Sequence, residues 1–132
     1  GTEFRIAEHG GRIIGFCKIG AVTVPIGKIP PKSMELRQLY VDHDFHGSGV
    51  AATLMAWALD RAHARNCENI YLSVYAENFR AQKFYQRHGF KVIGEYKFMV
   101  GSQADDELIM HLMIHHTLGD AADTTATHKD PA

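Results

Sequence analysis

Apolar residues recur with two different periods along the chain, and the changes of period predict the order of its elements. Alternation with a period of two, rich in β-branched and aromatic residues, predicts strands at 4–8, 12–19, 33–41 and 69–75. Apolar residues spaced three and four apart predict a helix over 51–64. A shorter helix is expected from an N-cap at Asn78 to a stop at Gly89, followed by strands at 90–100 and 107–114.

The connections between these segments predict a mixed sheet. A turn at His9-Gly10-Gly11 joins the first two strands into a hairpin, and prolines in 20–32 favour a loop with at most a short strand at 21–24. Strand, turn, helix and strand between 33 and 75 form a βαβ unit with a parallel pair. The last two strands, joined by a turn at 101–106, should pair antiparallel. The fold class is therefore α/β, in its α+β mixed-sheet form.

Composition limits the size of the domain and the classes of partner. The 132 residues are 45% hydrophobic, which is enough for one core, and we expect a single domain over 1–114. Residues 115–132 are small, polar and without periodicity, so a disordered tail is expected there. A net charge of -1 gives no basic footprint for nucleic acid or for membrane lipids. The expected partner is a discrete ligand.

The absence of apolar runs of membrane length and of a signal-peptide pattern leads us to expect a soluble, cytoplasmic protein. Cys17 and Cys67 are expected to be free, buried thiols in a reducing compartment. The nine histidines are scattered instead of spaced as ligands, so no metal site is expected.

A glycine-containing turn, His46-Gly47-Ser48-Gly49-Val50-Ala51, stands between a predicted strand and the longer predicted helix. Glycines let the backbone approach a ligand, and the first turn of a helix offers free N–H groups and a positive dipole end, so the turn can hold a phosphate. A purely geometric turn and a dinucleotide fingerprint are alternatives. The dinucleotide reading is disfavoured because a four-residue loop separates Val41 from His46 and the sheet is largely antiparallel.

Two motifs in this order resemble those of the GCN5-related N-acetyltransferase (GNAT) superfamily. The first is the turn, in which His46, Gly49 and Ala51 stand at the family's Gln/Arg, Gly and Gly/Ala positions. The second is 78–90, which matches the family's N-x-x-A-x-x-F-Y-x-x-x-G-F pattern. The resemblance implies a GNAT-like acyl-CoA N-acyltransferase fold. The family's usual first strand and first two helices have no counterpart in this sequence.

The resemblance also implies a binding site for acetyl-CoA as co-substrate. The pyrophosphate is expected on the N–H groups of the turn, and the pantetheine arm along 39–41 and beside Asn78. The residues expected to bind the co-substrate are Leu39, Val41, His46, Gly47, Ser48, Gly49, Val50, Ala51, Asn78 and Phe84. A histidine at the turn's first position carries full charge only below about pH 6.5, which predicts a pH-sensitive hold on the pyrophosphate.

Two residues are expected to take part in the chemistry that the resemblance implies. Tyr85 matches the family tyrosine that protonates the departing thiolate as general acid, although a packed aromatic residue is the alternative. Glu35 is a candidate general base for the amine, although a solvated strand-end carboxylate or a water chain would serve equally well. Asn78 can combine its contact to the pantetheine arm with a helix N-cap.

The expected reaction moves an acetyl group to a primary amine, by direct attack on the thioester. The stretch 39–47 is similar to the polyamine acetyltransferase branch, so a polyamine or other small amine is expected before a peptide amine. The alternative is a CoA-binding module without turnover. The elements that usually wall the acceptor pocket are missing, and exposed apolar surface in their place would favour a homodimer.

Overall fold

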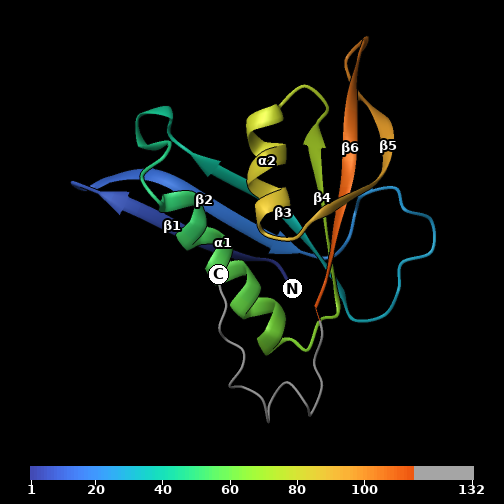
Figure 1. Cartoon of the computed structure of the whole chain (residues 1–132), viewed down its shortest axis with the longest axis horizontal. Helices are drawn as coiled ribbons and strands as arrows, with labels where there is room; N and C mark the ends of the chain where they lie inside the picture. The colour runs from blue at the N-terminus through green and yellow to red at the C-terminus, as the bar shows by residue number, and fades with distance from the viewer. Residues whose placement is uncertain (115–132) are drawn as a thin grey trace.

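The computed structural model describes residues 1–114, in which six strands form one sheet and two α-helices cover it (Figure 1). In chain order the elements are β1 (Glu3–His9), β2 (Arg12–Gly20), β3 (Ser33–Val41), the short 3-10 helix η1 (His43–Phe45), α1 (Val50–Ala64), β4 (Asn69–Tyr75), α2 (Phe79–Arg87), β5 (Lys91–Val100) and β6 (Gln103–Met113). The sheet order is β1-β2-β3-β4-β6-β5. The expected tail at 115–132 lies outside the described residues.

The elements agree closely with those expected from the sequence. β3 and β4 have the predicted bounds, they pair parallel, and β5 pairs antiparallel with β6. Two details differ. Residues 21–32 contain no strand, and β6 begins at Gln103, because the connection is a two-residue turn whose Gly101 takes a positive φ of 64°. A turn this tight lets the polar residues 103–106 continue the ladder with β5.

The two halves of the sheet separate between β3 and β4. These strands pair only through Ser33–Asn69, Met34–Ile70 and Glu35–Tyr71, near their beginnings. The register of β3 against β2 then shifts by one residue, because Lys18 faces Gln38 whereas Ile19 faces Leu36, so Arg37 is the extra residue of a β-bulge. Beyond the bulge, the edge of β3 that faces β4 has no strand paired to it.

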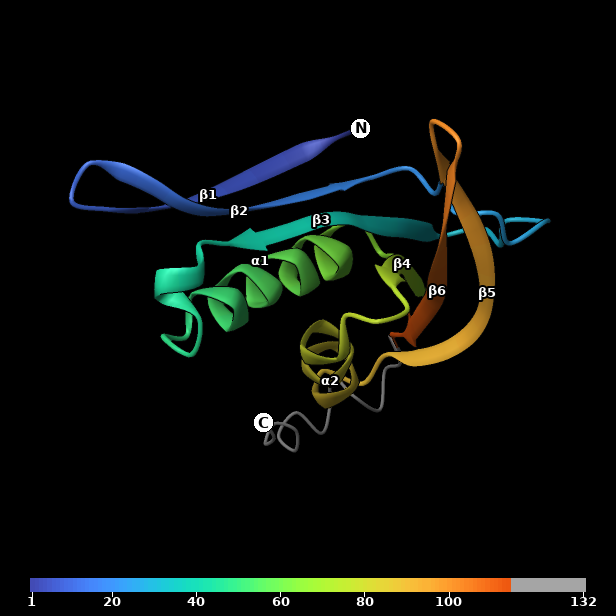
Figure 2. The ribbon, with the colours of Figure 1, turned by 90° about the horizontal axis from the view of Figure 1, so that it is seen from above.

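Both helices lie on the same face of the sheet (Figure 2). The apolar stripe of α1 is buried through Leu54, Met55, Ala58 and Ala62, as the three- and four-residue spacing predicted. The core continues through buried residues of the central strands and through Phe90, which follows α2. Neither helix is long and apolar enough to cross a membrane.

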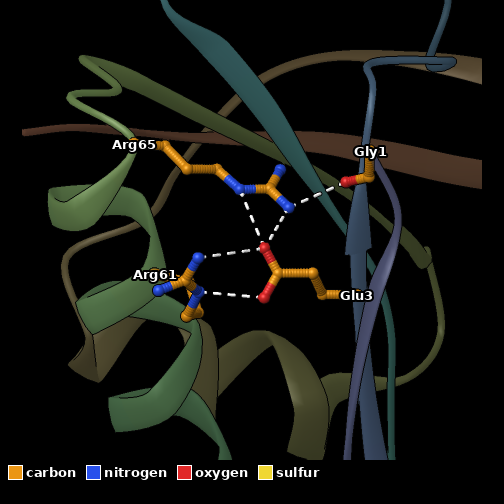
Figure 3. A network of polar contacts seen from close by, with 4 residues as sticks. All are labelled: Gly1, Glu3, Arg61 and Arg65. Atoms are coloured by element: carbon orange, nitrogen blue, oxygen red, sulfur yellow. Dashed lines mark hydrogen bonds and ion pairs between the residues drawn. The ribbon is translucent and has the colours of Figure 1, made fainter.

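An ion-pair network fastens the first strand to the end of α1 (Figure 3). The Glu3 carboxylate accepts hydrogen bonds from Arg61 Nε at 2.9 Å and Arg65 Nε at 3.1 Å, and further bonds from the terminal nitrogens of both guanidinium groups. Arg65 also donates to the Gly1 carbonyl. These contacts lower the pKa of Glu3, the hydrogen bonds from Arg61 and Arg65 being the main causes.

Candidate functional site

The glycine turn places a set of backbone N–H groups at the start of α1. Gly47 and Gly49 have φ values of 80° and 95°, which L side chains rarely adopt, so glycine is favoured at both positions. The first intrahelical bond runs from Thr53 N to Gly49 O at 3.0 Å. The N–H groups of 50–52 therefore have no intrahelical acceptor and are free to bind an anion.

Two side chains of the turn are engaged within the loop. His46 Nε2 lies 3.0 Å from the Val41 carbonyl, and its ring meets that of His43 edge-on with centroids 5.1 Å apart. The Ser48 hydroxyl donates to the Phe45 carbonyl, and Ser48 N–H donates to the same oxygen at 3.2 Å. Ser48 thus stabilises the turn, whereas His46 has Nδ1 available when Nε2 bonds the backbone.

The turn opens onto a groove of about 870 Å³, hereafter the loop groove. It runs between the end of β3, the turn and one face of α2. The predicted residues that line it are Leu39, Val41, His46, Gly47, Gly49, Ala51, Asn78, Phe84 and Tyr85. Ser48 and Val50 do not line it. A Cβ at Gly47 or Gly49 would meet no atom within 4 Å, so the open space begins at the backbone itself.

A second hollow of about 450 Å³, hereafter the strand hollow, lies where β3 and β4 separate. Its lining comes from the bulged part of β3 and the end of β4, together with Phe16 of β2. The residues shared with the loop groove are Leu39, Tyr40, Asn78, Ala81 and Tyr85. The two hollows therefore meet at α2 and the edge of β3.

Tyr85 stands at this meeting point. Its side chain is 8% exposed and packs edge-on against the rings of Phe84 and Phe90, with centroids 5.5 and 5.9 Å away. Burial, with a smaller contribution from Cys17, raises the pKa of Tyr85 to about 12. The hydroxyl consequently stays protonated through the neutral pH range, so the proton that a general acid donates is present there.

Asn78 caps α2 and lines both hollows. Its Oδ1 accepts a hydrogen bond from Ala81 N at 3.1 Å, which makes it the N-cap of α2. The residue also lines both hollows. Because the cap uses only the amide oxygen, the amide NH₂ remains able to donate to a ligand.

Glu35 lies away from this meeting point. It is 5% exposed, and its Oε1 accepts hydrogen bonds from Thr23 N at 2.6 Å, Thr23 Oγ1 at 2.9 Å and Val24 N at 3.2 Å. It lines neither hollow. The contacts that the structure gives Glu35 hold the 21–32 loop against β3, and its role as general base stays a prediction.

Several lining residues were not singled out from the sequence. Arg80, Lys83 and Arg87 on α2 line the loop groove and give it positive side chains, and their spacing of three and four residues on one helix was a readable signal. Ser73 lines the strand hollow from β4. Nothing in the sequence distinguishes it from the other polar residues of an alternating strand.

Cys17 and Cys67 are buried and form no disulfide, and burial raises the pKa of Cys17 to about 12. A thiol with so high a pKa is a poor nucleophile at neutral pH. No group of three metal-ligating side chains occurs within residues 1–114.

Comparison with known proteins agrees with this geometry. The family model described as the acetyltransferase (GNAT) family matches residues 2–90. An uncharacterized N-acetyltransferase of Mycobacterium tuberculosis is 33% identical over 104 residues, which are 79% of this chain and 62% of that protein. The chain thus spans less than two thirds of the length of this relative.

Solved structures show the same fold. Nourseothricin acetyltransferase superposes with a TM-score of 0.73 at 22% identity, over 85% of this chain and 65% of its own. The PaiA N-acetyltransferase of Thermoplasma acidophilum, solved in complex with coenzyme A, gives a TM-score of 0.65 at 24% identity, over 86% of this chain and 61% of its own. With the family model covering most of the described residues, the chain belongs to the GNAT family of acetyltransferases.

Proposed function

We propose that this chain transfers an acetyl group from acetyl-CoA to a primary amine by direct attack on the thioester. The observation that carries the proposal is the meeting of the loop groove and the strand hollow at Tyr85. A thioester reaching this point from one hollow could be attacked by an amine from the other.

The residues of the loop groove fit the co-substrate. The free N–H groups after Gly49 and the cationic side chains on α2 suit a pyrophosphate and a further phosphate, and the open space at both glycines leaves room for them. The unpaired edge of β3 offers main-chain groups to the two amides of a pantetheine arm, in the manner of an added strand. The coenzyme A complex of the T. acidophilum protein, which shares the fold, supports this assignment.

The reaction requires the protein to position the two reactants, to stabilise the developing negative charge and to supply one proton. Main-chain N–H groups at the β3 bulge would stabilise the negative charge that develops on the thioester oxygen. As the C–N bond forms and the C–S bond breaks, the Tyr85 hydroxyl gives its proton to the departing thiolate. The proton that the nitrogen loses on becoming an amide restores the hydroxyl.

The acceptor is proposed to be a polyamine or other small amine, with a peptide amine as the second candidate. The similarity of 39–47 to the polyamine acetyltransferase branch supports this order. The homodimer stays a prediction, supported by exposed apolar side chains on β1 and β2: Phe4, Ile6 and Ile13. Cysteines that form no disulfide, as Cys17 and Cys67, are typical of a cytoplasmic protein.

The test follows thiol release from acetyl-CoA with spermidine, an alkyl amine and a peptide carrying a free N-terminus. We expect release above background with at least one acceptor, and we expect Tyr85→Phe to lower kcat by about 100-fold, because general acid catalysis contributes about 10²–10⁴-fold. The same change keeps the ring that packs against Phe84 and Phe90.

Tyr71→Phe is the matched control, because Tyr71 is also buried but lines neither hollow. It should leave kcat unchanged. Tight CoA binding without thiol release for any amine, in the full-length protein as well, would show a CoA-binding module instead of an enzyme.

A further inference from the structure

We infer that Ser73 and Glu107 form a two-residue proton relay that takes the proton from the acceptor amine in the strand hollow. The inference rests on the proposed function and deepens it, because it assigns the base step to residues of β4 and β6. Four observations support it: the placement of both residues on one face of the sheet, their hydrogen bonds, the exposure of Ser73 to the strand hollow, and the engagement of Glu35 elsewhere.

The register of the sheet brings the two side chains together from strands far apart in sequence. Glu107 faces Tyr75 of β4 on one side and Tyr96 of β5 on the other. Ser73 is two residues before Tyr75, so its side chain lies on the same face. Leu72, Val74 and Leu108 point to the opposite face, where they join the core under the helices.

The hydrogen bonds fix the direction of proton transfer. Ser73 Oγ donates to Glu107 Oε1 at 2.8 Å and also lies 2.9 Å from the Tyr96 hydroxyl. A serine has one proton, which goes to the carboxylate, so Tyr96 is the donor in the second contact. One lone pair of Ser73 Oγ is left for a further hydrogen, and Ser73 lines the strand hollow.

The relay balances without any other reactant. An N–H bond of the acceptor ammonium breaks, and its proton joins Ser73 Oγ while the proton already there passes to Glu107 Oε1. The nitrogen keeps the electron pair with which it attacks the thioester. Glu107 later releases the proton to solvent, to which it is partly exposed.

Other charged groups lie around Glu107 without sharing its bond to Ser73. Asp105 and Asp106 precede it on β6. The charge of Glu77, followed by burial and the charges of these two residues and Glu107, raises the pKa of Tyr75. Lys97 of β5 forms an ion pair with Asp106 at 2.5 Å. The carboxylate that reaches the lining of the strand hollow through a hydrogen bond is that of Glu107.

The experiment measures kcat/KM on an alkyl amine and the Kd for CoA from about pH 7 to 9.5. Glu107→Gln keeps an oxygen that accepts from Ser73 but cannot take the proton. We expect it to lower kcat/KM by about 100-fold near neutral pH, with the CoA Kd unchanged within about 2-fold. The loss of kcat/KM should become smaller as the pH rises, because the amine has a pKa of about 10 and more of it is then unprotonated when it binds.

Three variants separate a relay from a structural role. Ser73→Ala should show the same defect and the same pH trend, and Ser73→Thr, which keeps the hydroxyl, should restore most of the activity. Tyr96→Phe removes the other bond to Ser73 and should change kcat/KM by less than about 3-fold. Glu95→Gln is the matched control, because Glu95 faces Leu108 and so lies on the opposite face of the same hairpin.

If the wild-type chain turns over and the kcat/KM of Glu107→Gln near neutral pH is within about 3-fold of the wild-type value, the relay is overturned and the proposed function stays intact. A defect that does not change with pH would also overturn it, since a structural role gives that result. No turnover by the wild-type chain would instead overturn the proposed function, and the relay with it.

Discussion

At the scale of single residues, the site depends on side chains that have a structural partner and still present a free atom. Asn78 is the clearest case, because its amide oxygen caps α2, the cap leaves its NH₂ able to donate, and the residue lines both hollows. The sequence could predict that Tyr85 and Asn78 lie near each other, because both belong to one motif at a short helix, where local spacing fixes the relative positions, and both line the two hollows. The surroundings of Glu35 could not be predicted from local spacing, since its partners Thr23 and Val24 come from a loop without periodicity.

The double role of Asn78 can be separated by substitution. Asn78→Ser keeps a capping oxygen and removes the NH₂, so the free energy of unfolding should change little, whereas the Kd for CoA should rise by about 3- to 10-fold for one lost hydrogen bond. Asn78→Ala removes both and should also cost about 1 kcal/mol of stability. Calorimetric titration and chemical denaturation measure the two effects. Equal CoA affinity of wild type and Asn78→Ser would exclude a contact from the NH₂.

At the scale of elements, the turn between β3 and α1 determines where the helix N–H groups point. Gly49 is the N-cap of α1 with a φ of 95° and no side-chain cap, so the direction of the first turn depends on a conformation that glycine alone adopts easily. The sequence identified this turn, and helical periodicity located α1 to within one residue. It did not show the β3 bulge, because Arg37 reads as one more residue in an alternating strand.

Gly49→Ala tests the turn against a matched site. The new methyl meets nothing within 4 Å, so the effect comes from φ and should cost about 1–2 kcal/mol of stability. Gly27→Ala has a similar φ of 76° and equally open space, but Gly27 lines neither hollow. Both variants should lose similar stability in urea denaturation, and only Gly49→Ala should weaken CoA binding, by about 10-fold. An equal loss of CoA affinity in both would mean that strain alone, and not the turn, is responsible.

At the scale of the whole molecule, the Glu3 network joins the edge of the sheet to the far end of the helix that carries the turn. Hydrogen bonds from Arg61 and Arg65 lower the pKa of Glu3 in the folded chain, so its carboxylate binds a proton more weakly there than in the unfolded chain. The stabilisation is therefore present above the unfolded pKa of about 4.3 and is lost as the pH falls through the lower folded pKa. Thermal unfolding should show this loss on acidification.

Glu3→Gln should lower the Tm by a few degrees at pH 7, and the difference from wild type should disappear below the folded pKa of Glu3. Glu8→Gln is the matched control, because Glu8 is exposed on the same strand and has no ion pair within the described residues. A Tm difference between Glu3→Gln and wild type that persists unchanged into acid would contradict this assignment.

The sequence by itself determined the elements, the glycine turn before α1 and the helix α2 that carries Tyr85, because each depends on contacts between residues close in the chain. Only the tertiary structure decided how far β3 and β4 stay paired, which residue forms the bulge, and that Ser73 meets Glu107 across 34 positions. The strand register and the separation of β3 from β4 arise from the packing of the whole sheet on its helices. Short-range periodicity in the sequence does not reveal that packing.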